Sequence, residues 1–344
     1  MEILIGLLVI ALGAFCQSSC YVPINKIRSW SWESYWLVQG VFAWLVLPFL
    51  GMLLAVPAGH SLGGMFAAAP SFNIWMTVLF GVLWGVGGLT FGLSMRYLGV
   101  ALGQSIALGT CAGLGTVMGP LLLQVFFPET DPISQLTAAV IIGVVVTLAG
   151  IAIIGGAGSM KARSLSPEEQ KAAVKDFNFP RGLAIALLCG LMSGCFNVGL
   201  EFGAGINFGD ATDPMFRTLP ATFLVTLGGF ATNAAYCLWQ NGRNGTWGDY
   251  RDGSVWANNL FFCILAGALW YSQFFGLALG KGFLTSSPTL MTLSFCILMA
   301  LNVVFSNLWG IILKEWKGCS RATIAVLVTG IAVLVVSCFL PQLI

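Results

Sequence analysis

A single carboxylate interrupts an apolar, glycine-rich stretch of the sequence. Glu201 lies in GLMSGCFNVGLEFGAG, residues 190–205, and no basic residue lies within two helical turns of it. An acid in the middle of a bilayer costs about 3 kcal/mol, so acids in such positions usually face a cavity and handle protons or substrate. We therefore predict proton coupling or substrate binding for Glu201. A hydrogen-bonded role in helix packing and a side chain that snorkels to the membrane surface are the alternatives.

A second acid, Glu33, lies in WSWESYW at the start of another apolar run. An acid in the first turn of a helix complements the positive end of the helix dipole, which gives Glu33 a structural interpretation. Proton coupling through Glu33 is the second hypothesis, after Glu201.

Two tryptophans, Trp84 and Trp270, lie near the middle of their apolar runs, away from the membrane surfaces where tryptophans usually collect. Core packing is one interpretation. The other is a sugar site, because a sugar stacks its C–H face on an aromatic ring while amide side chains bind its hydroxyl groups. Unpaired amides are costly in lipid, so amides within apolar runs must line a cavity or join helices. The predicted sugar site consists of Trp84, Trp270, Gln17, Gln39, Gln104, Asn197, Gln273 and Asn302.

The composition places these residues in a membrane protein. Hydrophobic residues make up 58% of the chain and charged residues only 8%, whereas about a quarter of the residues are charged in soluble proteins. The net charge of +2 provides no basic patch for nucleic acid. The cysteines form no CxxC pair and there is one histidine, so we expect no metal, no cofactor and no disulfide framework. No histidine cluster, carboxylate pair or activated nucleophile indicates an enzyme.

Ten apolar runs are long enough to cross a bilayer, which takes roughly 20 residues. Backbone groups in lipid must be paired within their own segment, so the predicted fold is an all-α bundle of transmembrane helices. The first run has no basic leader and no clear cleavage site, so we predict a retained helix. The runs cover residues 3–22, 33–56, 73–97, 99–127, 133–155, 182–208, 216–240, 256–280, 288–313 and 322–342.

The basic residues predict the orientation of these helices. Lysine and arginine are retained on the cytoplasmic side of short loops. If the N-terminus is outside, only Arg217 and Lys281 of the 15 basic residues fall on outer connections. Both termini are therefore predicted to face the outside.

A long polar connection divides the predicted helices into two sets of five. It gives an N-terminal repeat over residues 1–155, a cytoplasmic linker over 156–181 and a C-terminal repeat over 182–344. A duplicated unit with an odd number of spans inserts its second copy upside down, so we predict a 5+5 inverted repeat. Two pairs of similar short segments agree with duplication. GVLW at 81–84 resembles GALW at 267–270, and GAF at 13–15 resembles GCF at 194–196. Glycines at spacings of four indicate close helix packing or, alternatively, a sliding interface.

Four segments together resemble a known family of transporters. They are NKIRSWSWESYW (25–36), GLSMRYLGVALGQSIALG (92–109), LWYSQFFGLALG (269–280) and LKEW (313–316). The sequence resembles the L-rhamnose–proton symporter family of the drug/metabolite transporter superfamily along nearly the whole chain. The resemblance implies a 5+5 inverted repeat, the inner membrane of a bacterium and uptake of a deoxy-sugar driven by protons. The role of Glu201 is inferred from its position, since no family motif matches it.

The leading hypothesis is proton-coupled uptake of L-rhamnose or a related deoxy-sugar by alternating access, that is, symport. Its partners would be the sugar, protons and membrane lipids. The alternative is a proton-antiport exporter of metabolites or drugs from the same superfamily.

Overall fold

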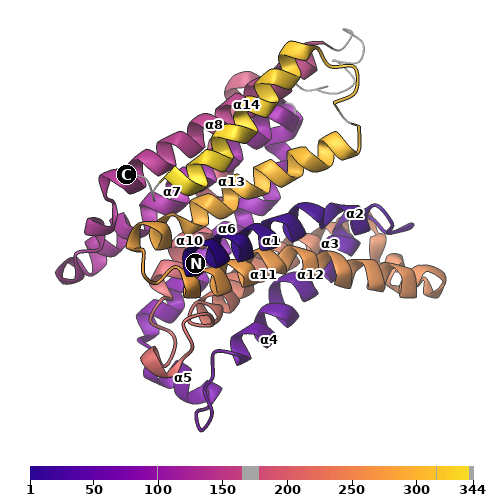
Figure 1. Ribbon diagram of the computed structural model, residues 1–344. Coiled ribbons are helices and arrows are strands. Elements are labelled where there is room, and N and C mark those ends of the chain that lie inside the picture. The colour runs from indigo at the N-terminus through magenta and orange to yellow at the C-terminus, as the bar shows by residue number, and fades with distance from the viewer. Residues whose placement is uncertain (99, 165–177, 315, 341–344) are drawn as a thin grey trace. The chain divides into compact units, whose positions relative to one another are not determined.

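The computed structural model describes residues 1–98, 100–164, 178–314 and 316–340, and this part of the chain is helical with no strand (Figure 1). Within it, 10 helical segments are long and apolar enough to cross a membrane. The prediction of an all-α, multi-pass membrane protein with ten spans is confirmed. The spans are Glu2–Ile24, Trp32–Leu53, Ser71–Leu98, Gly103–Phe126, Ala138–Arg163, Phe179–Phe202, Leu219–Asn244, Gly253–Phe283, Pro288–Ile312 and Arg321–Phe339.

Single α-helices form most of these spans. They are α6 (Ser71–Leu98), α7 (Val100–Phe126), α8 (Ala138–Arg163), α10 (Phe179–Phe202), α11 (Leu219–Asn244), α12 (Gly253–Phe283), α13 (Pro288–Ile312) and α14 (Arg321–Phe339). The first span joins α1 (Glu2–Ser19) and α2 (Tyr21–Ile24). The second joins α3 (Trp32–Gly40), a π-helical turn η1 (Val41–Val46) and α4 (Leu47–Leu53), and the short helix α5 (Leu62–Ala68) follows it. Short 3-10 turns occupy Pro128–Thr130 (η2), Pro132–Gln135 (η3), Gly209–Ala211 (η4) and Thr246–Arg251 (η5).

Two predicted helix ends differ from the structure by more than five residues. The helix predicted over 182–208 ends at Phe202, and the chain then turns, with the Ile206 N–H donating to the Gly203 carbonyl at 2.9 Å. Glycine is a poor helix former, and Gly203 and Gly205 follow the last helical residue directly. The helix predicted over 133–155 continues as α8 to Arg163, into the predicted linker 156–181. Residues 165–177 of that linker lie outside the described residues.

The helices gather into two compact units. The first unit contains Met1–Gly85 and Phe202–Ser286, and the second contains Val86–Glu201 and Ser287–Ile344. Each unit therefore combines helices from both predicted repeats. The chain passes between the units three times, within α6, near the end of α10 and between α12 and α13.

In the first unit, α1 packs along α12, and the second span packs against α11 and α12. Small residues allow the closest approaches, as expected where no hydrophobic effect drives helices together. A Cβ atom at Gly81 of α6 would collide with the carbonyl oxygen of Val225 in α11, and one at Gly228 would collide with that of Val78. The backbones of α6 and α11 are therefore in direct contact.

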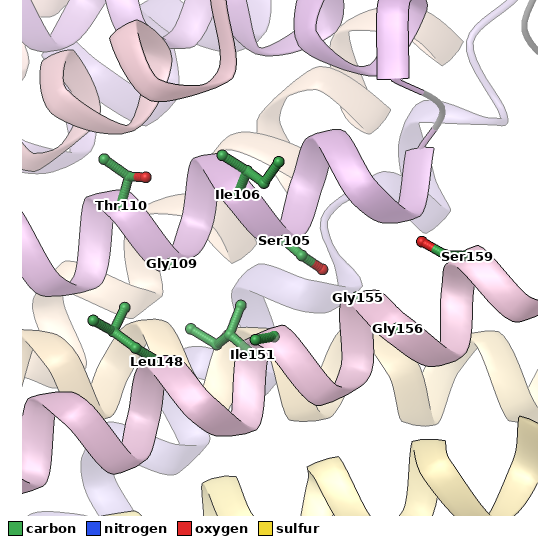
Figure 2. Close-up of a pocket in the computed structure, with 10 residues that line it drawn as sticks. Ser105, Ile106, Gly109, Thr110, Leu148, Ile151, Gly155, Gly156 and Ser159 are labelled. Carbon is green, nitrogen blue, oxygen red and sulfur yellow. The ribbon is translucent and has the colours of Figure 1, made fainter. Parts of the chain in front are cut away.

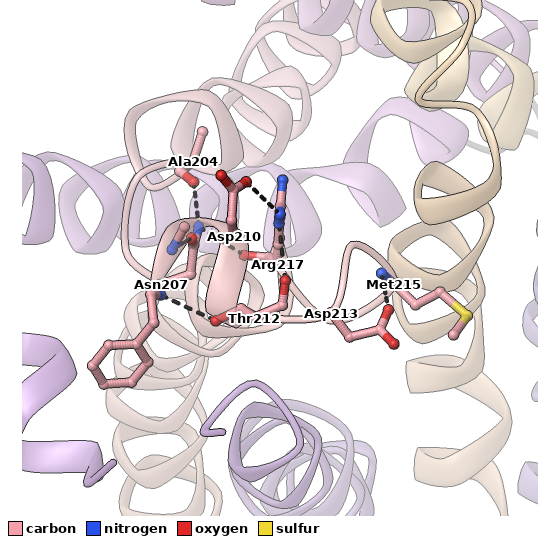
Figure 3. Close-up of polar contacts among 9 residues, drawn as sticks. Ala204, Asn207, Asp210, Thr212, Asp213, Met215 and Arg217 are labelled. Carbon is pink, nitrogen blue, oxygen red and sulfur yellow. Dashed lines mark hydrogen bonds and ion pairs between the residues drawn. The ribbon is translucent and has the colours of Figure 1, made fainter. Parts of the chain in front are cut away.

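A compact connection, residues 203–218, leads from α10 into α11. Arg217 forms an ion pair with Asp210 at 3.1 Å, and its Nε donates to the Thr212 carbonyl at 3.1 Å (Figure 3). Ile206 of the same segment is fully buried in an apolar cluster with Met52, Met65 and Leu224. The connection thus packs its apolar side into the first unit and keeps its charges at the surface.

In the second unit, α8 lies along α14, and α7 packs against α8 and α13 (Figure 1). Thr147 of α8 donates to Ser337 of α14 at 3.0 Å, and both side chains are buried. Each hydroxyl thereby has a partner inside the protein, which lipid cannot provide.

The contact at Gly81 gives a test of this packing. We expect Gly81→Ala to lower the midpoint of thermal unfolding in detergent by an amount corresponding to about 1–3 kcal/mol, because the added methyl overlaps the Val225 carbonyl. Gly88→Ala on the same helix is the matched control, since no heavy atom lies within 4 Å of an added Cβ there. That control should be neutral or slightly stabilising. Equal midpoints for the two variants would contradict the close contact.

Candidate functional site

A cluster of tryptophans occupies the first unit. Trp84 of α6 and Trp270 of α12 lie 5.7 Å apart between ring centroids. Trp44 meets both edge-on, at 6.0 Å from Trp84 and 5.7 Å from Trp270. Trp36 meets Trp44 at 5.5 Å and stacks on Trp32 at 5.5 Å. These five residues, here called the tryptophan cluster, bring together the two rings predicted from the sequence.

Trp44 is the central ring of this cluster, and the sequence analysis did not single it out. Its side chain is 3% exposed, whereas Trp84 and Trp270 are partly exposed. Trp44 lies in the middle of the span Trp32–Leu53. The mid-span position that marked Trp84 and Trp270 would also have found Trp44, had it been applied to every tryptophan.

The predicted amides of the first unit belong to α1, α3 and α12. Gln39 is 1% exposed and belongs to the last turn of α3, and no hydrogen-bond partner is found for its Oε1. Gln273 is 3% exposed and donates to the Trp270 carbonyl one helical turn earlier. The Gln273 backbone also lies against Gly13 of α1. Gln17 lies near the end of α1 and is partly exposed.

The predicted amides of the second unit lie on three helices. Asn197 of α10 is 2% exposed and donates from Nδ2 to the Gly115 carbonyl of α7 at 2.9 Å, which joins the two helices. Asn302 is buried in α13. Gln104 lies near the start of α7 and is partly exposed. Asn197 therefore has a packing role in the structure, whether or not it also contacts substrate.

Glu201 is the last residue of the stretch Val86–Glu201 in the second unit and the last but one of α10. Its stem packs against Gly119 of α7, where an added Cβ would lie 2.8 Å from the Glu201 Cγ. The side chain is partly exposed. Among the described residues, no hydrogen-bond donor or basic group is found against its carboxylate. The C-terminal end of a helix also offers no favourable dipole for a negative charge.

Glu33 has the opposite surroundings. It is 6% exposed, and its Oε1 accepts hydrogen bonds from Asn244 Nδ2 and Thr246 Oγ1, each at 2.9 Å. Gly245 lies between these donors with a φ of 70°, a left-handed conformation that suits glycine and turns the chain from α11 into η5. Glu33 thus ties the start of the second span to the end of α11.

Asp249 of η5 extends this polar contact to the residue before α3. Its Oδ2 accepts from the Ser31 N–H at 2.8 Å and from the Ser31 hydroxyl at 2.7 Å. Burial acts to raise the pKa of Asp249, but the hydrogen bonds from Ser31 and Ser34 outweigh it and hold that pKa below its usual value. Asp249 is therefore charged across the physiological pH range and anchors η5 to α3.

A shallow depression of about 420 Å³ lies between α7 and α8 in the second unit (Figure 2). Its wall includes the hydroxyls of Ser105, Thr110 and Ser159 beside Leu148 and Ile151. None of the predicted site residues lines it. It offers neither an aromatic ring nor an amide, so it lacks the chemistry expected of a sugar site.

The described residues also contain no group of three or more His, Cys, Asp or Glu side chains placed to hold a metal ion. The ten cysteines are free thiols, and most of them are buried.

Comparison with known proteins identifies the family. Residues 1–343 match the family model described as L-rhamnose-proton symport protein (RhaT). The chain is 31% identical over 342 residues to the L-rhamnose-proton symporter of Cronobacter sakazakii, with 97% of this chain and 96% of the relative aligned. It is also 31% identical over 352 residues to the symporter of the same name from Yersinia pestis, with the same coverage. The predicted resemblance is confirmed, and the chain belongs to the L-rhamnose–proton symporter family.

Proposed function

We propose that this protein takes up L-rhamnose or a related deoxy-sugar together with protons, in the inner membrane of a bacterium. The observation that carries the proposal is membership of a symporter family over nearly the whole chain. The ten membrane spans agree with it. Symporters are transporters and not enzymes, so that prediction is confirmed as well. Export by antiport is not favoured, and placement in the drug/metabolite transporter superfamily remains part of the proposal.

The tryptophan cluster is the proposed sugar site. Aromatic rings carry a negative face, which attracts the C–H groups of a sugar ring. Trp84 and Trp270 are partly exposed and lie 5.7 Å apart, so a sugar could contact either ring from its exposed side. Gln39 and Gln273, both buried in the same unit, are the nearest predicted amides along the chain that could bind hydroxyl groups.

Contacts between corresponding residues support the proposed 5+5 inverted repeat. In two copies related by a two-fold axis, a residue meets its own counterpart only at that axis. Trp84 and Trp270, separated by 186 residues in the sequence, are in contact. Gly150 and Gly330, separated by 180 residues, are also in contact. A Cβ atom added at Gly330 would lie 3.2 Å from the Gly150 carbonyl oxygen. The similar separations favour duplication.

Neighbouring contacts repeat in the same way. Gly81 of GVLW abuts α11, the seventh span, and Gly267 of GALW abuts the second span at Gln39 and Ala43. The second and seventh spans correspond in a 5+5 repeat. The segments GVLW and GALW therefore contact corresponding spans, which supports the proposed inverted repeat.

Alternating access links the sugar to the proton in this proposal. A buried charge without a partner opposes closure of a site, so a carrier that changes state readily only when it is both protonated and loaded, or neither, couples the two movements. Glu201 fits this role best, because it is partly exposed and no partner is found for its carboxylate among the described residues. Glu33 is the second candidate, although its hydrogen bonds from Asn244 and Thr246 also suit a purely structural role.

External L-rhamnose should raise the pH of the medium around energy-depleted cells that express the protein, because inward symport removes protons from that medium. A pH electrode measures the change, and cells with an empty vector are the control. No change with the sugar, together with proton release on addition of a lipophilic amine, would favour antiport.

We expect Glu201→Gln to abolish uphill accumulation of L-rhamnose while sugar exchange without a gradient continues. The amide keeps the shape of the side chain but cannot carry a proton. Glu33→Gln is the comparison and should accumulate sugar normally if Glu201 carries the proton. Radiolabelled uptake in right-side-out vesicles measures both activities, and full accumulation by Glu201→Gln would exclude its coupling role.

Trp270→Ala and Trp84→Ala should each weaken L-rhamnose binding by about tenfold or more, corresponding to loss of roughly 1.4 kcal/mol of contact. Trp75→Ala is the matched control, because Trp75 lies on α6 with 72% of its surface exposed and outside the cluster. Isothermal titration of the purified variants measures the affinity. Unchanged affinity in both cluster variants would place the site elsewhere.

The proposed orientation has its own test. A membrane-impermeant thiol reagent should fail to label Ser166→Cys in intact cells, because the linker is predicted to be cytoplasmic. Ser166 lies outside the described residues. Gly63→Cys, in the exposed helix α5 of a predicted outer connection, should react readily. Both are made after Cys16 and Cys319, the two partly exposed native thiols, are changed to Ser. If Ser166→Cys is labelled and Gly63→Cys is not, the orientation of the protein is the opposite of the one proposed.

A further inference from the structure

The indole N–H of Trp44 is a buried donor for which the structure provides no acceptor. Its Nε1 has less than 1 Å² of accessible surface and no hydrogen-bond partner in the part of the chain that the structure describes. Trp36, its neighbour in the cluster, is different, because its Nε1 donates to Asn233 Oδ1 at 3.1 Å. Buried N–H groups in proteins almost always have a partner, and exceptions commonly mark functional positions.

The local backbone is built to hold Trp44 in this place. The ring folds back over Gly40, where an added Cβ would lie 2.6 Å from the ring atom Cζ3. Trp44 also belongs to the π-helical turn Val41–Val46, and such turns are rare and frequently occur at functional sites. Gly40 and the π-helical turn Val41–Val46 thus together fix the position of the unpaired Trp44 N–H.

The surroundings of this N–H match the needs of a sugar hydroxyl. The ring of Trp44 is nearly perpendicular to those of Trp84 and Trp270, at 6.0 and 5.7 Å between centroids, so a sugar stacked on either ring would lie beside Trp44. A hydroxyl both donates and accepts a hydrogen bond. Gln39, five residues earlier, has a buried Oε1 that also lacks a partner. The same short segment therefore contains an unpaired donor and an unpaired acceptor.

We propose that Trp44 donates a hydrogen bond from Nε1 to one hydroxyl group of the bound sugar and thereby determines which sugars the protein accepts. The proposal rests on the sugar uptake proposed above. The rings of the cluster contact one another, and bound sugar takes the place of part of that contact. The oxygen of the sugar hydroxyl accepts from the Trp44 N–H.

Trp44→Phe tests the proposal, because phenylalanine keeps an aromatic ring and removes the donor. We expect the Kd for L-rhamnose, measured by isothermal titration on the purified protein, to rise about tenfold. The unfolding midpoint without sugar should fall less than in Trp36→Phe, since the smaller ring loses packing but no protein hydrogen bond is broken. Trp36→Phe is the matched control, and it should lower that midpoint because Asn233 loses its donor.

Monodeoxy analogues of L-rhamnose identify the contacted hydroxyl. The wild-type protein should bind one analogue about tenfold more weakly than L-rhamnose. Trp44→Phe should bind that analogue and L-rhamnose equally, because the donor and its acceptor form one interaction and their losses do not add. Additive losses for every analogue would overturn the proposal.

The N–H could instead contact the face of a neighbouring ring, which is a weak hydrogen bond. In that case Trp44→Phe would lower the midpoint without sugar as much as Trp36→Phe and leave the Kd unchanged, and the proposal would be wrong. If Trp44→Phe does not fold, 3-benzothienylalanine at position 44 keeps the bicyclic shape with sulfur in place of N–H, and the same Kd comparison applies. Failure of the wild-type protein to bind L-rhamnose would reject the proposed function itself. Normal binding of L-rhamnose by Trp44→Phe and by the 3-benzothienylalanine variant would reject only the role of Trp44.

Discussion

Lipid provides no hydrogen bonds, so every polar group inside a membrane span needs a partner within the protein. The rest of the structure follows from this constraint. It makes the spans helical, and it pairs Thr147 with Ser337 across two helices. It also explains why Asn197 and Asn233 donate to backbone carbonyls of neighbouring helices. A polar group without such a partner is costly, and its presence therefore needs a reason.

The same constraint separates two kinds of polar residue in this protein. Glu33 accepts hydrogen bonds from Asn244 and Thr246 and joins the second span to the seventh. Such a group stabilises one arrangement of helices. Glu201 has a carboxylate without a partner among the described residues, and Trp44 has a buried N–H without one. Groups of the second kind are suited to a proton or a substrate, which arrives and leaves during transport.

The proposed duplication with inversion would account for the position of the tryptophan cluster. Trp84 and Trp270 come from the third and eighth spans, which are counterparts in the proposed repeat, and they contact each other in one compact unit. A site on an axis between two copies presents the same ring chemistry to both sides of the membrane. Alternating access needs this property, because one site must exchange its contents with either side. Trp44 has no tryptophan counterpart in the seventh span, where Gly229 lies against the Trp84 ring instead.

The sequence alone determined the ten spans, the membrane environment and the family. Hydropathy over about 20 residues is a local property, and motifs such as LWYSQFFGLALG need no coordinates. Trp84 and Trp270 were found because their mid-span position is visible in the sequence. Only the tertiary structure decided that these rings meet, that Trp44 contacts both of them and that Glu33 bonds to residues more than 200 positions away. The physical reason is that the lipid and the protein interior between the helices are equally apolar. Contacts between spans therefore depend on small residues and shape, which leave no hydropathy signal to read.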